Sequence, residues 1–326
     1  MIDLSLLPPP DVVESLEFET IYQVALSDFR LLMGDQWTAV LESDPVVKLL
    51  EVAAYQKMLG RARVNAAAKA SLLAYAKGAD LDNRAADYGV QRLTITPAQP
   101  DALPPVAAMM ESDSALRYRT RLSLEALSVA GSRGAYEYHG LSASANVSSV
   151  SVDSPVFAGV ALTDAQKAVL PAGAIVVTCT YAAGLENPLP GDVSLAVLGR
   201  VGSPETPAEL VAAVQAALSA ESVRPLTDRP RTQAGLATDF KVSATLELEA
   251  GPEPAVVLAN ARSGLDSALA EARRMEGQLP LSAIYAALHV TGVRRVVLTA
   301  PTDDVTCDKR HYPNCTAITL KTKVVA

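Results

Sequence analysis

The segment from Pro45 to Lys77 constrains the fold most, because it contains no residue that must end a helix. Asp44 precedes it, where a carboxylate can cap free amides, and a proline suits the first helical turn. Gly60 is tolerable inside a helix, so Gly78 is the first strong stop. At 1.5 Å per residue such a helix spans about 50 Å, which is longer than a small domain needs.

Apolar or small side chains repeat by sevens on two faces of this predicted helix. The first seam, interrupted by Lys69, contains Val52, Tyr55, Leu59, Ala62, Ala66, Leu73 and Ala76, and the second contains Val46, Leu50, Ala53, Gly60, Val64, Ala67 and Ala74. A surface helix has one apolar face, so this helix needs neighbours on both sides. We interpret it as one strand of an intermolecular bundle, with interface residues Val46, Leu50, Val52, Ala53, Leu59, Val64, Ala66 and Leu73. An internal helix of an ordinary all-α domain remains the alternative.

Periodicity and composition divide the chain into four predicted segments. The first segment, residues 1–95, begins with a proline-stiffened entry (1–10) and continues with a helix (12–33), the bundle helix and a short helix ended by Gly89. A proline-rich linker follows at residues 96–111. The third segment is a helical connector (112–146), and the fourth forms one or more α+β domains (147–326). Within the last segment, residues 147–152, 174–182, 242–250, 293–300 and 317–325 read as strands, separated by helices over 204–220, 255–274 and 281–290. The predicted fold class is α+β, with long N-terminal helices followed by mixed α+β domains.

Charge and composition exclude several functional classes. The formal net charge of −8 argues against nucleic-acid binding, which requires clustered excess Lys and Arg. No apolar run reaches the roughly 18 residues of a membrane span, and the first residues lack a signal-peptide pattern. Three cysteines indicate a reducing compartment. In the basic run at 117, 119 and 121, Arg117 and Arg121 share one face of a predicted helix, with Glu125 one turn further on, and we interpret this as a solvated face with an i,i+4 ion pair.

Motifs for catalysis are missing from the sequence. Glycine-rich nucleotide loops, a G-x-S-x-G elbow and H-E-x-x-H do not occur, so we predict no catalytic residue and no cofactor. Cys307 and Cys315 each lie four residues from His311 and form a weak zinc candidate, for which Asp303, Asp304, Asp308 or a partner chain could supply the fourth ligand. A reduced loop between two strands is the favoured interpretation.

Several blocks of the sequence resemble the baseplate J-like proteins of contractile-tailed phages, in particular the protein J type of P2-like phages and phage tail-like bacteriocins. The blocks are PVVKLLEVAAYQKMLGRARVNAAAKASLLAYAKGADLDNRAADYGVQRL, DSALRYRTRLSLEALSVAGSRGAYEYHG, VSSVSVDSP, AIVVTCTYA and LTAPTDD, in this order. The resemblance covers most of the chain from about Asp44 onward.

This resemblance implies a structural wedge protein of a baseplate. Two copies would join one copy of a smaller partner of the protein I type through a core bundle of long helices. The distal domains would link neighbouring wedges into a ring around the tail hub, in contact with other baseplate and sheath-initiating proteins. The chain would assemble in the bacterial cytoplasm and end in the baseplate of a phage or bacteriocin particle. A stand-alone enzyme or ligand-binding protein, with its site in the α+β domain, is the alternative.

Overall fold

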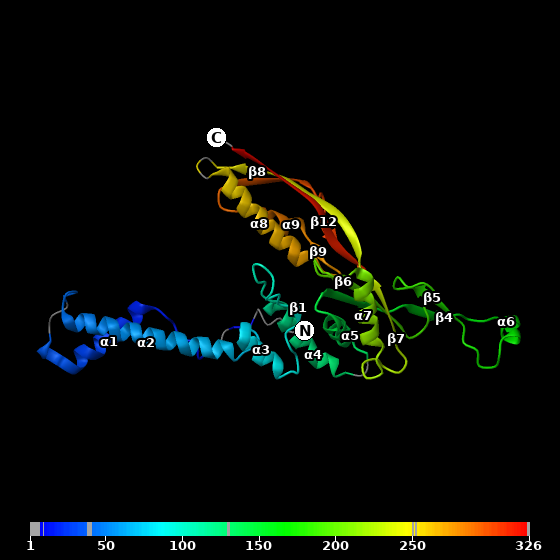
Figure 1. Cartoon of the computed structure of the whole chain (residues 1–326), viewed down its shortest axis with the longest axis horizontal. Helices are drawn as coiled ribbons and strands as arrows, with labels where there is room; N and C mark the ends of the chain where they lie inside the picture. Colours follow the sequence, from blue (N-terminus) through cyan, green and yellow to red (C-terminus); the bar gives the residue numbers. More distant parts are fainter. Residues whose placement is uncertain are drawn as a thin grey trace. The chain divides into compact units, whose positions relative to one another are not determined.

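Figure 1 shows a computed structural model, which describes residues 7–8, 10–37, 41–128, 131–249, 251 and 253–324. The expectations for residues 1–6, Pro9, Ala250 and Val325 lie outside these residues. The chain divides into two compact units, Met1–Leu93 with Met110–Arg121, and Thr94–Met109 with Leu122–Ala326. The four segments predicted from the sequence divide the chain differently, and their boundaries stay predictions.

The first unit is helical. Its elements are α1 (Phe18–Met33), the 3-10 turn η2 (Gly34–Gln36), α2 (Pro45–Ala70), α3 (Gly78–Ala86) and the first part of α4 (Asp113–Ala126). α1 lies along α2 (Figure 1), and the pair buries Ile21 and Leu26 of α1 with Val47 and Ala54 of α2. The first helix was predicted to begin at Val12 and in fact begins at Phe18, after residues 13–17, which have no regular secondary structure.

The long helix begins as predicted and ends earlier. The Asp44 carboxylate caps α2 by accepting a 2.8 Å hydrogen bond from the Val46 amide, with Pro45 in the first turn. The prediction that the helix continues to Lys77 is wrong, because α2 ends at Ala70 and turns follow it. Its 26 residues therefore span about 39 Å rather than about 50 Å.

The second unit contains two larger sheets, of which the first has three strands. β6 (Asp192–Gly199) is its central strand and pairs antiparallel with β3 (Val147–Asp153) and parallel with β7 (Arg229–Ala234). α5 (Arg133–Ala143) and α7 (Pro207–Ser219) pack on the sheet. The core between them includes Leu122, Tyr136, Val150, Val152, Leu195, Val197, Leu210, Val214 and Leu218. A capping box of Thr206 and Glu209 starts α7.

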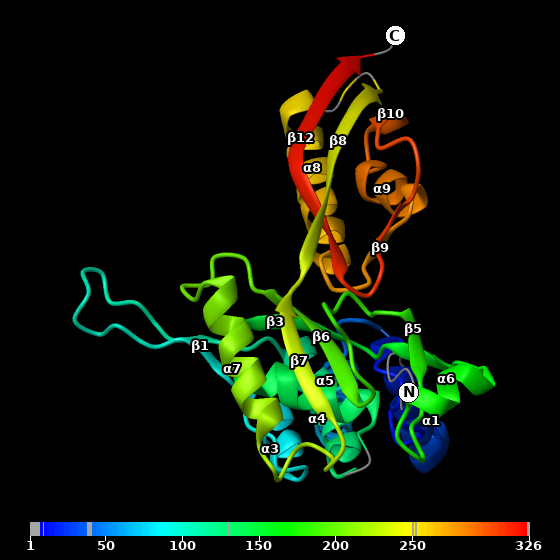
Figure 2. The same cartoon turned by 90° about the vertical axis from the view of Figure 1, so that its right-hand side faces the viewer.

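A hairpin projects from this sheet. β4 (Val156–Gly159) pairs antiparallel with β5 (Val177–Tyr181), and α6 (Asp164–Val169) lies at the far end of the pair (Figures 1 and 2). A second hairpin, β1 (Thr94–Thr96) with β2 (Met109–Met110), occupies most of the predicted linker and is extended by a bridge between Gln99 and Val106.

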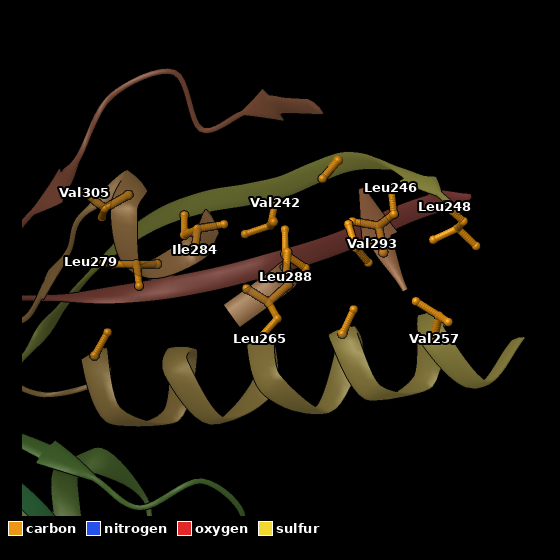
Figure 3. Close-up of a cluster of buried hydrophobic side chains, with 13 residues drawn as sticks. Val242, Leu246, Leu248, Val257, Leu265, Leu279, Ile284, Leu288, Val293 and Val305 are labelled. Atoms are coloured by element: carbon orange, nitrogen blue, oxygen red, sulfur yellow. The ribbon is translucent and has the colours of Figure 1, made fainter. Parts of the chain in front are cut away.

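The C-terminal part is a second sheet covered on one face by helices (Figure 2). β8 (Leu236–Leu248) lies between β10 (Val293–Ala300), which is antiparallel to it, and β12 (His311–Val324), which is parallel. α8 (Pro254–Ala272) and α9 (Leu281–Leu288) pack on this sheet, and β9 (Gln278–Leu279) pairs with β11 (Val305–Thr306). Figure 3 shows Val242, Leu246 and Leu248 of β8 packed with Leu265 of α8 and Leu288 of α9.

The strands and helices predicted for the second unit are thus present, and the α+β class is confirmed. Among the described residues, no helix is long and apolar enough to cross a membrane.

Candidate assembly interface

α2 presents one buried face and a broad exposed one. The residues of α2 buried within the chain are Val47, Ala54 and Asn65, which lie on one side of the helix. Leu59 lies five residues from Ala54, and Val52 lies five residues from Val47. Five residues correspond to a rotation of about 140°, so Val52 and Leu59 face away from the buried side.

The first predicted seam is exposed along α2 except at Ala62, which is half-buried. Val52 is 57% exposed, Tyr55 48% and Leu59 44%, and Ala66 is also exposed. These positions follow one another by three, four and seven residues, so their side chains form a continuous apolar stripe. Nothing in the same chain covers this stripe among the residues that the structure describes.

The second predicted seam is partly covered. Val46 and Leu50 are half-buried, whereas Ala53 and Val64 are exposed, Val64 to 55%. Leu73 was predicted to extend the first seam on the helix, but it lies three residues beyond the end of α2 and is half-buried. The structure therefore leaves seven of the eight predicted interface residues on the helix and places Leu73 in the turns that follow it.

An N-terminal arm (residues 10–17) occupies the side of α2 that the seams leave free. The Asn65 side chain accepts a 3.0 Å hydrogen bond from the Glu14 amide and donates a 2.8 Å bond to the Glu14 carbonyl. Arg61 adds an ion pair of 2.6 Å to the Glu14 carboxylate. These contacts attach the backbone of Glu14 to α2, four residues before the first helix begins at Phe18.

An arginine cluster fixes the turns after α2. Arg117 donates to the carbonyls of Leu73 and Ala76 at 2.8 and 2.6 Å. Arg119 is 5% exposed and forms a bidentate pair with Glu111, at 2.9 and 2.7 Å. The predicted solvated face is therefore wrong for Arg117, and the neighbouring Arg119 is buried. Sequence spacing placed these arginines on a helix but could not show that backbone carbonyls and Glu111 surround them.

The weak zinc candidate is not assembled. No group of three or more His, Cys, Asp or Glu among the described residues is arranged to hold a metal. Instead, Nδ1 of His311 lies 2.6 Å from the Asp308 carboxylate, and the Cys315 thiol lies 3.5 Å from the carbonyl of Ala317. The segment is also not simply a loop, because β12 begins at His311 and contains Cys315.

The carboxylates give no support to the enzyme alternative. Asp113, Asp153, Glu209 and Asp308 have pKa values below the ordinary range. Backbone amides are the main cause in Asp113 and Glu209, whereas in Asp153 and Asp308 burial acts in the opposite direction and is outweighed by hydrogen bonds. Each shift favours the charged form in a cap or an ion pair, which is the arrangement of a structural group rather than of a general acid.

Comparison with known proteins identifies the family. The model of the Baseplate J-like N-terminal domain matches residues 42–99, and that of the Baseplate J-like protein C-terminal domain matches residues 240–321. Baseplate protein J of Escherichia phage P2 is 40% identical over 322 residues, which cover 97% of this chain and 96% of that protein. The chain belongs to the baseplate J-like family.

Membership of the baseplate J-like family confirms the resemblance seen in the sequence and supports a structural role in a baseplate. The N-terminal match contains the whole of α2, and the C-terminal match contains α8, α9 and nearly all of the sheet that they cover.

Proposed function

We propose that this baseplate J-like chain is a wedge component of a contractile tail, which assembles with a second copy of itself and a smaller partner of the protein I type. In this proposal α2 supplies one strand of a helical bundle, and the α+β unit links wedges into a ring around the tail hub. The protein carries out no catalysis, binds no nucleic acid and works in the baseplate after assembly in the bacterial cytoplasm.

The observation that carries the proposal is the exposed apolar stripe on α2. α1 and the N-terminal arm already occupy the face of Val47, Ala54 and Asn65, so the stripe at Val52 and Leu59 is free for another chain. Full burial of a leucine or valine side chain stabilises an assembly by about 1.5–3 kcal/mol. Without a partner, this stripe would be an exposed hydrophobic patch, which commonly marks an interaction site or a cause of aggregation.

The experiment is co-expression of the chain with the candidate partner encoded by the neighbouring gene, followed by size-exclusion chromatography with light scattering. Leu59→Asp places an unpaired charge in the proposed bundle and is expected to abolish the heteromeric complex. Leu226→Asp is the matched control, because Leu226 is 98% exposed and lies outside α2. If Leu59→Asp and the parent form the same complex in equal yield, the proposal is contradicted and α2 is an internal helix of its own unit.

A further inference from the structure

The apolar stripe on α2 has one edge that its own chain covers and one edge that is open. The heptad pattern of the stripe starts with Val52 at position a. Met58 and Asn65 then occupy g positions along one edge, and Gln56 and Arg63 occupy e positions along the other. Met58 is half-buried and Asn65 is buried, whereas Gln56 and Arg63 are exposed. A helix that packs on the stripe therefore meets Arg63 at the open edge.

Arg63 has no opposite charge beside it. Among the residues that the structure describes, none forms an ion pair with Arg63 within 4.0 Å. The single carboxylate of α2 belongs to Glu51, which is paired with Lys48 at 3.0 Å. Residues 52–70 of the helix contain four cations and no carboxylate, and one of these cations, Arg61, is paired with Glu14. The exposed part of α2 is therefore both apolar and basic.

The α2 helix of a second copy cannot supply the missing charge. In a parallel pair of helices in register, an e residue faces the g residue of the preceding heptad, which for Arg63 is Met58. In an antiparallel pair an e residue faces another e residue, and the e positions of this stripe hold Gln56, Arg63 and Ala70. Neither arrangement sets a carboxylate opposite Arg63.

The first helix of a second copy matches the stripe poorly, although it carries carboxylates. Over residues 19–28, the exposed side of α1 consists of Glu19, Thr20, Gln23, Val24, Ser27 and Asp28, of which only Val24 is apolar. Such a surface would cover Val52 and Leu59 with mainly polar side chains, and those side chains would lose water without gaining hydrogen-bond partners. The complementary helix must be apolar and acidic together, which neither long helix of this chain is.

We propose that the helix covering the apolar stripe belongs to the unlike partner chain, and that it is amphipathic, with an apolar face toward Val52 and Leu59 and a carboxylate beside Arg63. The inference rests on the proposed function and adds the chemistry of the partner to it. A carboxylate replaces the hydrogen bonds that the Arg63 guanidinium loses when the partner helix displaces water. Charges at e and g positions set partner choice and orientation in helical bundles, so this pair would favour the unlike chain over a second α2.

The first test is the affinity of the full-length chain for the candidate partner from the neighbouring gene, measured by sedimentation velocity at low and high salt. Arg63→Glu leaves the stripe apolar but sets two like charges together, and it should weaken the complex at least about tenfold. Arg63→Met removes the charge and keeps an apolar stem, so its complex should be less sensitive to salt than that of the parent. Arg274→Glu is the matched control, because Arg274 is an exposed arginine outside α2. Circular dichroism should show that each variant keeps the parent fold.

The second test identifies the occupant of the open edge. A carbodiimide joins a lysine amine directly to a carboxylate that touches it, so Arg63→Lys makes position 63 reactive, whereas the parent has no amine there. In the assembled complex, mass spectrometry should find position 63 linked to an Asp or Glu of the partner. A link from position 63 to a second copy of this chain would overturn the proposal, and so would a complex in which position 63 forms no link.

Leu59→Asp separates a failure of this inference from a failure of the proposed function. If Leu59→Asp abolishes the complex while Arg63→Glu leaves its affinity and salt dependence unchanged, the bundle stands and the acidic partner is contradicted. If Leu59→Asp leaves the complex unchanged, the stripe is not the interface, and the proposed function fails together with this inference. Loss of the complex in both variants, with Arg274→Glu unaffected, is the result expected.

Discussion

Nζ of Lys309 lies 2.6 Å from Oδ1 of Asp153, a residue 156 positions earlier in the chain. Asp153 ends β3 of the first sheet, and Lys309 lies just before β12 of the second. Two other residues of β3 make similar contacts: Ser151 donates a 2.6 Å bond to Glu276, and Ser149 accepts a 3.1 Å bond from the amide of Met275. One face of β3 therefore joins the C-terminal part, while Val150 and Val152 fill the core of the first sheet.

Asp153→Asn should lower the free energy of unfolding at neutral pH and make that free energy less dependent on pH in the acidic range. Burial would raise the pKa of Asp153, but hydrogen bonds from Lys309, Tyr181 and the Ser154 amide outweigh it and hold the pKa below its ordinary value. A carboxylate with a lowered folded-state pKa stabilises the fold above its unfolded pKa of about 4, and this contribution is lost as pH falls through the folded-state value.

We expect the variant to lose about 1–3 kcal/mol in urea unfolding at pH 7, followed by circular dichroism. At pH values well below about 4, the difference between the variant and the parent should shrink. A difference that stayed constant from pH 7 to acid would mean that the Asp153 charge does not contribute to stability.

Removing one partner of the buried pair between Arg119 and Glu111 should destabilise the first unit strongly. The side chains are 6% and 1% exposed, so Glu111→Leu would leave an arginine charge buried without its carboxylate. The expected cost is about 3–5 kcal/mol, measured by urea unfolding with the fluorescence of Trp37, the single tryptophan, as the signal. Adding Arg119→Met to Glu111→Leu should recover part of the loss. If the double variant is as unstable as Glu111→Leu alone, the unpaired arginine charge is not the cause of the destabilisation.

Asn65→Ala should release the N-terminal arm and leave α2 intact. The substitution removes the two hydrogen bonds between Asn65 and the backbone of Glu14. Hydrogen exchange read by mass spectrometry should therefore accelerate in residues 10–17. Gln56→Ala is the matched control, because Gln56 is an exposed amide on the same helix. Unchanged protection of the arm would indicate that Arg61 and apolar contacts hold it instead.

Limited proteolysis with subtilisin should cut first between Pro97 and Pro105. This segment is the end of the β1–β2 hairpin, where Leu103 is 98% exposed and few backbone groups are paired. A first cut inside residues 242–249, in the middle of the C-terminal sheet, would contradict the expectation that the end of the hairpin is more accessible to protease than this sheet.

Periodicity predicted the elements with a clear repeat. The alternation in residues 147–152 and 242–250 predicted strands that are found within β3 and β8, and the helical connector predicted over 112–146 contains α4 and α5. The central strand β6 was missed, because DVSLAVLG is apolar at successive positions and shows no alternation. Its burial on both faces explains that pattern.

The residues at which α1 begins and α2 ends, and the surroundings of the arginines, depend on contacts with residues far away in the sequence. Local sequence patterns could therefore not predict them. Nothing local at Ala70 stops a helix, and the turns after it are held by Arg117, 41 to 44 residues later in the chain. The arm before Phe18 is fixed by Asn65, 51 residues away from Glu14. The two-seam interpretation of α2 included neither contact. The contact of Asn65 lies on a third face of the helix, and the contacts of Arg117 lie beyond the end of the helix.

The most direct measurement of the central claim is the accessibility of position 59 before and after assembly. Leu59→Cys would be made in a chain whose Cys179, Cys307 and Cys315 are replaced by serine, with Leu226→Cys as the control, and each introduced thiol would be labelled with a maleimide. If α2 is a strand of an intermolecular bundle, the thiol at position 59 reacts in the isolated chain and is protected after assembly with the partner, whereas the thiol at position 226 reacts in both. Equal labelling of position 59 in the free and assembled states would contradict the bundle.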